Sequence, residues 1–208
     1  MQIISHRGCW NDTAKKNTEK AFRRALNLNY GIETDVRDYN GEIVISHDIA
    51  KDSCLTFLRF CEIVNEANNN PCIALNIKSD GLQEKLKHIL NNLDIRNYFV
   101  FDMSVPDAYL YINEKFNVFA RQSEFEQNPS FYEASQGIWL DAFHNEWYDE
   151  HVIEKHLIAE KKVCIVSPEL HKRNHANLWK MIQQTGLYKN DNLYLCTDFA
   201  EEASRFYE

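Results

Sequence analysis

The fold and the candidate site both depend on residues 6–48, which read HRGCWNDTAKKNTEKAFRRALNLNYGIETDVRDYNGEIVISHD. A short apolar run at residues 2–5 predicts a first strand that ends at His6. Apolar residues at helical spacing then predict a helix over 17–28. The stretch therefore begins as a strand-loop-helix unit with an imidazole at the end of its strand.

The next strand is predicted over residues 31–36, GIETDV, where alternation places Glu33 and Asp35 on one face. Two carboxylates two residues apart on one face suit a hard cation. A turn and a second short strand at 43–45 precede His47. Two histidines therefore lie at strand ends, on either side of the strand that carries the acids.

Composition indicates an ordinary globular protein. The chain has 208 residues, 44% hydrophobic and 26% charged, and we expect one domain over 1–208. A formal charge of −8 argues against a nucleic-acid surface or a polybasic membrane patch. The start of the chain has no basic or long apolar leader, and no later stretch has the length of a membrane span. A cytoplasmic protein without a transmembrane segment is the expectation, with its oligomeric state open.

Six cysteines are scattered without the spacing of a metal site. We expect them to be reduced and mostly buried. Cys9 follows the first strand and could lie near the site, but packing is its simplest role, because the sequence places no base to activate it.

Short apolar strands alternate with helical segments along the rest of the chain. The expected strands cover 2–5, 31–36, 72–77, 98–102, 117–121, 137–141, 162–167 and 192–196, and the expected helices cover 17–28, 55–64, 82–93, 106–115, 131–135, 149–160, 175–185 and the residues from 198. Eight such units predict a compact α/β fold, the (β/α)₈ TIM barrel, with the strand at 43–45 outside the series. The alternative, an open doubly wound sheet, predicts a glycine-rich turn after the first strand, which is not what residues 6–10 provide.

A barrel would gather the residues at the C-terminal ends of its strands around one mouth. These residues are mostly polar or charged: His6, Arg7, Glu33, Asp35, Asn76, Lys78, Asp102, Arg121, Asp141, Ser167 and Asp198. A cation on the acids, beside two imidazoles, an arginine and a lysine, suits a phosphate diester. One histidine would accept a proton from the attacking hydroxyl while the other protonates the leaving oxygen.

A set of motifs matches a known family in order and spacing. They are HRG at 6–8, NT at 17–18, GIETDV at 31–36, GEIV at 41–44, HD at 47–48, LNIK at 75–78 and CTD at 196–198. Together they resemble the signature of glycerophosphodiester phosphodiesterases. The resemblance implies a TIM barrel with His6 and His47 as the acid/base pair and with Arg7 and Lys78 on the phosphate. It also implies attack by a neighbouring hydroxyl of the substrate, giving a cyclic phosphate that water can open.

The resemblance implies a divalent cation, Mg²⁺ or Ca²⁺, on Glu33 and Asp35, and no other cofactor. Asn76 stands where the family usually has a third acidic ligand, so an amide oxygen would replace a carboxylate. Asp102, at the next strand end, could complete the site. The alternatives are that Asn76 is a hydrogen-bonded strand-end residue and Asp102 a helix N-cap.

Two further departures concern the substrate. Lys16 replaces the family's usual Glu before Asn-Thr, and the usual insertion after the HD motif is absent, since a helix is expected from Leu55. Arg121, Asp141 and Trp147, on later loops, are expected to bind the substrate and shape its choice.

The leading hypothesis is a metal-assisted phosphodiesterase acting on a small glycerophosphodiester-like substrate. A second is a phosphate-binding barrel that has lost turnover, motivated by Asn76 and Lys16. A third is a lyase that releases a cyclic phosphate from an inositol or sugar phosphodiester.

Overall fold

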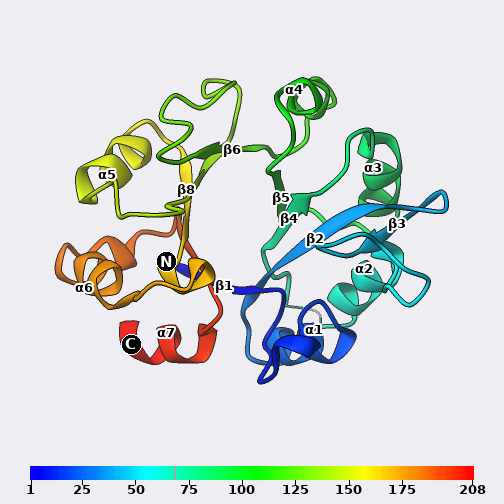
Figure 1. Ribbon diagram of the computed structural model, residues 1–208, viewed down its shortest axis with the longest axis horizontal. Helices are drawn as coiled ribbons and strands as arrows, with labels where there is room; N and C mark the ends of the chain where they lie inside the picture. The colour runs from blue at the N-terminus through cyan, green and yellow to red at the C-terminus, as the bar shows by residue number, and fades with distance from the viewer. Residues whose placement is uncertain (68) are drawn as a thin grey trace. The chain divides into compact units, whose positions relative to one another are not determined.

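A computed structural model describes residues 1–67 and 69–208, which form two compact units (Figure 1). The N-terminal unit comprises Ser5–Asn117, and the C-terminal unit comprises Val118–Glu208 together with Met1–Ile4. Strand β1 (Gln2–His6) contributes residues to both. The expectation of a single domain over 1–208 stays a prediction.

The N-terminal unit contains parallel strands in the order β5-β4-β2, with β3 antiparallel to β2. The strands are β2 (Gly31–Tyr39), β3 (Glu42–Ile45), β4 (Ile73–Ile77) and β5 (Tyr98–Phe101), and the helices are α1 (Glu19–Asn27), α2 (Phe57–Glu66), α3 (Gln83–Asn92) and α4 (Val105–Asn113). Asp35 of β2 lies opposite Asn76 of β4, and Asn76 lies opposite Phe101 of β5. This register sets the polar ends of three neighbouring strands side by side.

Local sequence explains where α1 begins and which face it buries. Its N-cap is Thr18, whose hydroxyl accepts a hydrogen bond from the backbone N–H of Ala21. Phe22 and Ala25 are fully buried on the predicted apolar face. Leu28, predicted on the same face, is instead the C-cap and is 39% exposed, because the helix ends one residue earlier.

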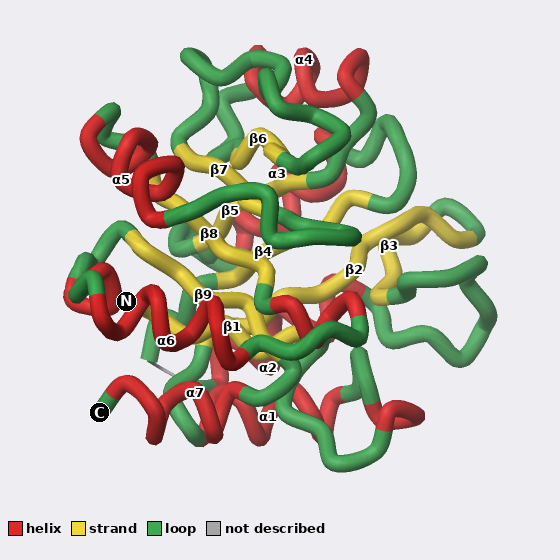
Figure 2. Tube along the Cα trace, turned by 60° about the vertical axis from the view of Figure 1, so that its left-hand side comes forward, coloured by secondary structure: helices red, strands yellow, loops and turns green. Residues whose placement is uncertain are grey.

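The C-terminal unit contains parallel strands in the order β9-β8-β7-β6. The strands are β6 (Phe119–Gln122), β7 (Gly137–Leu140), β8 (Lys162–Val166) and β9 (Leu193–Thr197), and the helices are α5 (Glu150–Ile158), α6 (Ala176–Gln184) and α7 (Ala200–Tyr207). Short 3₁₀ helices lie at Pro168–His171 and Leu187–Lys189 in this unit and at Thr13–Lys15 in the N-terminal unit. From β7 onward, each strand of this unit is followed along the chain by a helix. Figure 2 draws the helices in red and the strands in yellow.

The helix predicted at 131–135 is wrong. These residues form a turn in which the backbone N–H groups of Ala134 and Ser135 donate to the carbonyl of Phe131. Phe131 has a φ of 59°, in the left-handed region, where a right-handed helix cannot continue. The connection from β6 to β7 is therefore the unit of the series that carries no helix within the described residues.

The order of the strands distinguishes the (β/α)₈ barrel from the doubly wound sheet, the two folds that the sequence suggested. In each unit, parallel neighbours follow one another along the chain apart from β3, and a helix follows each of these strands except β6. A doubly wound sheet would instead reverse its direction of winding. The chain has the compact (β/α)₈ fold that the sequence predicted. No helix in the described part of the chain is both long enough and apolar enough to cross a membrane.

His156 of α5 is a buried imidazole held in its neutral form. Its Nε2 lies 2.7 Å from Oε1 of Gln122, and its Nδ1 lies 2.9 Å from the hydroxyl oxygen of Tyr132. The amide oxygen can only accept, so Nε2 carries the proton and the tyrosine hydroxyl donates to Nδ1. Burial lowers the pKa of His156 to about 4 from 6.5, with a smaller contribution from the charge of Lys155. A proton therefore binds the unfolded chain more readily than the folded one.

We expect stability to fall on acidification for this reason. The contribution of His156 is complete above pH 6.5 and is lost as the pH falls toward 4. Measured by urea unfolding, the free energy of unfolding of the wild type should fall by about 2 kcal/mol relative to that of His156→Gln between pH 7 and pH 4.5. Other titrating groups are common to both proteins and cancel in this difference. A difference that does not change with pH would contradict the neutral, buried imidazole.

Candidate active site

The two acids of β2 are buried, which excludes a solvated strand face. Glu33 is 1% exposed and Asp35 is fully buried. Charged groups at such depth require partners of opposite charge, hydrogen-bond donors, or a bound proton. Asp35 has cationic partners and a hydrogen-bond donor, and Glu33 has a hydrogen-bond donor and a bound proton, as described below.

Asp35 is the centre of a charged network. Its Oδ2 forms an ion pair with Nε of Arg7 at 2.9 Å and accepts a hydrogen bond from Nδ2 of Asn17 at 2.9 Å. Its Oδ1 lies 3.6 Å from Nζ of Lys78. The two predicted phosphate contacts, Arg7 and Lys78, are therefore brought together on one carboxylate. The two cationic side chains are 20% and 19% exposed, so they lie nearer the surface than the buried carboxylate that they share.

Glu33 is placed beside the first histidine. Its Oε2 lies 3.8 Å from Nε2 of His6 and accepts a hydrogen bond from the backbone N–H of Arg7 at 3.3 Å. Burial, and then the charge of Asp35, raise the pKa of Glu33 to about 8. With that pKa, the carboxyl group holds a proton at neutral pH.

Lys78 extends between two carboxylates. Its Nζ lies 3.6 Å from Oδ1 of Asp35 and 3.6 Å from Oδ2 of Asp102. Asp102 follows β5 with a φ of 70°, a left-handed conformation that is uncommon for a residue with a Cβ. The N-cap of α4 is Ser104, not Asp102. The structure thus gives Asp102 a place in the charged network and excludes the capping alternative.

Two buried oxygens of this network accept no hydrogen bond from any described residue. They are Oδ1 of Asp35 and Oδ1 of Asn76, which belong to residues opposite each other on β2 and β4. Buried polar atoms without a donor point to a missing partner. Carboxylate and amide oxygens are the ligands that Mg²⁺ and Ca²⁺ prefer. The amide oxygen of Asn76 is therefore left without the hydrogen bond that the alternative interpretation expects, and the role of Asn76 stays a prediction.

Acidic and histidine side chains do not make a metal cluster by themselves. Within residues 1–67 and 69–208, no group of three or more His, Cys, Asp or Glu side chains is placed to hold a metal ion. A divalent cation at this position would depend on the amide of Asn76 as well as on Glu33 and Asp35, with water in the rest of its shell. Asp35 and Asn76 fit such a cation, because each has a buried oxygen that accepts no hydrogen bond from the described residues.

His47 lies on the loop after β3. The backbone N–H of the preceding residue, Ser46, donates to the carbonyl of Asp35 at 3.0 Å, so the loop is attached to the acidic strand. The His47 side chain is 47% exposed, and its Nδ1 lies 2.9 Å from Oδ1 of Asp48. That contact, followed by the charges of His47, Arg7 and Arg37, lowers the pKa of Asp48. A carboxylate on Nδ1 leaves Nε2 as the proton acceptor of a neutral imidazole.

Sequence reasoning missed two residues that organise the site. Asn17 was predicted to open a helix and to belong to the NT motif, but no contact was assigned to its side chain. Its amide N–H donates to Asp35, and its amide oxygen accepts from the hydroxyl of Thr34 at 2.9 Å. Its φ of 57° is one that asparagine tolerates better than most residues. Arg37 donates to the backbone carbonyls of Asp48 and Lys78. Neither role leaves a periodic signal in the sequence.

The remaining predicted residues lie in the C-terminal unit. Asp141 Oδ1 lies 2.7 Å from Nε2 of His171, which sequence reasoning missed as a partner. The indole N–H of Trp147 donates to the carbonyl of Asp141 at 2.8 Å. Arg121 forms an ion pair with Glu126, with Nη2–Oε2 at 2.8 Å. Asp141 and Trp147 are therefore neighbours, whereas the guanidinium of Arg121 is paired with Glu126.

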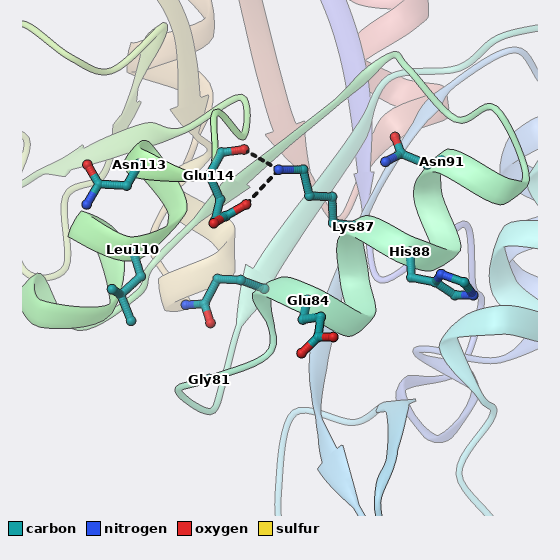
Figure 3. A pocket seen from close by; sticks show the side chains of 9 residues that line it. Gly81, Glu84, Lys87, His88, Asn91, Leu110, Asn113 and Glu114 are labelled. Atoms are coloured by element: carbon teal, nitrogen blue, oxygen red, sulfur yellow. Dashed lines mark hydrogen bonds and ion pairs between the residues drawn. The ribbon is translucent and has the colours of Figure 1, made fainter.

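A groove of about 790 Å³ lies on the surface of the N-terminal unit between α3 and α4 (Figure 3). It is lined by Gly81, Gln83, Glu84, Lys87, His88, Asn91, Leu110, Asn113 and Glu114. Lys87 crosses it to reach Glu114. None of the predicted site residues lines this groove.

The comparisons show the fold of the chain. The structure is similar to the crystal structure of glycerophosphodiester phosphodiesterase from Agrobacterium tumefaciens str. C58, with a TM-score of 0.70 and 15% sequence identity. The match covers 100% of this chain and 98% of that one. No protein-family model matches the sequence, and no curated protein matches it. The chain therefore shares the fold of that structure over its whole length.

Proposed function

We propose that the protein is a phosphoric diester hydrolase that acts in the cytoplasm on a small glycerophosphodiester-like substrate, with the help of a divalent cation. The observation that carries the proposal is the network around Asp35. There, two cationic side chains pair with the carboxylate of Asp35, and Asp35 and its strand neighbour Asn76 each have an oxygen that accepts no hydrogen bond from the described residues. The fold shared with a glycerophosphodiester phosphodiesterase supports the same reaction class.

Arg7 and Lys78 would bind the phosphate. Both belong to the network of Asp35, and their side chains are 20% and 19% exposed, so a ligand can reach them. A guanidinium can hold two phosphate oxygens at once, whereas an ammonium acts as a point charge. Together they would stabilise the negative charge that develops on the phosphoryl oxygens during transfer.

His47 and His6 would move the protons. His47, with Nδ1 on Asp48, is suited to accept the proton of a neighbouring substrate hydroxyl at Nε2. The oxygen of that hydroxyl forms a bond to phosphorus while the bond to the leaving alcohol breaks. His6 would give its proton to the departing oxygen. In a second step the roles would be exchanged: His6 would accept a proton from water, whose oxygen attacks phosphorus, and His47 would protonate the substrate oxygen as the cyclic phosphate opens.

Glu33, Asp35 and Asn76 would hold the cation, with Asp102 as a further candidate. When bound, such an ion neutralises charge on the phosphoryl oxygens. The two unpartnered oxygens support this assignment. Arg121, Asp141 and Trp147 stay proposed determinants of substrate choice, with Mg²⁺ and Ca²⁺ as the candidate ions.

Two alternatives keep the same site. The amide of Asn76 in place of a third acid favours a barrel that binds phosphate without turnover. A lyase acting on an inositol or sugar phosphodiester would stop at the cyclic phosphate.

Phosphorus NMR of glycerophosphodiesters incubated with the purified protein would separate these functions. We expect product with Mg²⁺ or Ca²⁺ and none after addition of a chelator, since the cation balances charge on the phosphoryl group. An open phosphomonoester indicates the hydrolase, and a cyclic product that persists indicates the lyase. A ligand that raises the melting temperature without any product would favour the binding barrel over the enzyme.

A further inference from the structure

The positively charged ammonium of Lys78 lies between the carboxylates of Asp35 and Asp102. It lies 3.6 Å from Asp35 Oδ1 and 3.6 Å from Asp102 Oδ2. These distances describe ion pairs and are too long for good hydrogen bonds. The ammonium is therefore held by charge and can be exchanged for another cation without breaking a directed bond.

The rest of Lys78 is fixed. Its backbone N–H donates to the carbonyl of Val36 at 2.9 Å, and its carbonyl accepts from Nη2 of Arg37 at 3.2 Å. Four methylene groups separate this fixed backbone from the ammonium, which can move by rotation of the side chain. The ammonium of Lys78 can therefore change its position while the backbone of the residue stays in place.

Asp35 divides its two oxygens between different partners. Oδ2 is engaged by Arg7 and Asn17, whereas Oδ1 accepts no hydrogen bond from the described residues and has Lys78 at 3.6 Å. Oδ1 is therefore the oxygen available to a divalent cation. A cation bound there would lie only a few ångströms from the ammonium, and two like charges at that separation repel strongly in a partly buried site.

We propose that Lys78 is the counter-ion of Asp35 and Asp102, that a divalent cation displaces it from these two carboxylates, and that the displaced ammonium is then available to the phosphate. This inference rests on the cation site of the proposed function but not on turnover. It predicts that cation and phosphate each strengthen the binding of the other, because phosphate draws away the charge that competes with the cation.

Calorimetric titration of Ca²⁺ and Mg²⁺ into substrate-free protein tests the competition. Lys78→Met should bind the cation about tenfold more tightly than the wild type, since the competing charge is gone. Lys78→Arg keeps the charge and should bind weakly, like the wild type. Lys87→Met, which removes an exposed ammonium paired with Glu114 on the helical surface, is the matched control and should change nothing.

Inorganic phosphate provides the second arm. At a saturating concentration it should tighten cation binding to the wild type and leave the affinity of Lys78→Met unchanged. Without metal, Lys78→Met should melt at a lower temperature than the wild type, and Ca²⁺ should restore most of the loss. Equal or weaker cation binding by Lys78→Met, or a wild type that binds no cation, would overturn the inference.

Amine labelling of the wild type keeps the test decisive if Lys78→Met does not fold. Measured by mass spectrometry, the labelling rate of Lys78 should rise when Ca²⁺ is added, while that of Lys87 stays constant. An unchanged or lower rate at Lys78 contradicts displacement. Because these measurements need no substrate, an inactive protein that passes them loses the proposed function alone, and an active one that fails them loses only this inference.

Discussion

His6→Ala and His47→Ala are each expected to lower kcat/KM for a phosphodiester by about 10²–10⁴-fold, the range for loss of a positioned general acid or base. His6 lies beside Glu33, and His47 lies on a loop whose backbone is hydrogen-bonded to that of Asp35. The His47 side chain is 47% exposed, so His47→Ala should melt close to the wild type, whereas His6→Ala, which truncates a side chain that is 11% exposed, should melt at a somewhat lower temperature. Steady-state kinetics with saturating cation is the measurement.

The two histidines can be distinguished by the leaving group. A nitrophenyl phosphodiester releases an anion that needs no proton, so it should rescue much of the activity of His6→Ala and little of His47→Ala. His151→Ala is the matched control, because that imidazole is 78% exposed on α5 and pairs only with the nearby Glu154 among the described residues. Unchanged rates for both site variants would refute acid/base catalysis by this pair, and rescue of the opposite variant would exchange their roles.

Residue periodicity predicted the elements that bury a continuous face. Alternation over 31–36 placed Glu33 and Asp35 on β2, and helical spacing placed Phe22 and Ala25 in the core. Periodicity failed where a single backbone angle determines the local structure. At Phe131 the positive φ produces a turn where a helix was predicted. Such an angle is set by packing and hydrogen bonding, not by the side chain's own preference.

The site was predictable to the level of its charged residues but not of its pairings. Strand ends indicated that Lys78 and Asp102 would be neighbours of the acids, because parallel strands bring their C-terminal ends to one edge. That the ammonium extends between Asp35 and Asp102 depends on side-chain rotamers and on the left-handed φ of Asp102. The role of Asn17 likewise depends on a contact across the loop after β1.

Asp35→Asn should be among the most destabilising single changes at the site. It removes the charge that pairs with Arg7 at 2.9 Å and Lys78 at 3.6 Å, and it leaves two partly buried cations without their shared partner. Loss of one partner of a buried pair costs about 3–5 kcal/mol, and the partial exposure of the two cations places the expected loss near the lower end. Urea unfolding at pH 7 in the presence of a chelator measures it.

Glu33→Gln provides the contrast, because the two acids lie on the same strand at similar depth. The pKa of Glu33 is raised to about 8, so its carboxyl is neutral at pH 7 and a neutral amide should cost less than about 1 kcal/mol. A raised carboxyl pKa contributes stability below pH 4.5 that is lost as the pH rises through 8. Wild type should therefore lose stability relative to Glu33→Gln over that window. Equal losses for Asp35→Asn and Glu33→Gln at pH 7 in the presence of a chelator would mean that both side chains are ionised and would contradict a neutral Glu33. In that case Arg7 and Lys78 serve two carboxylates, not one.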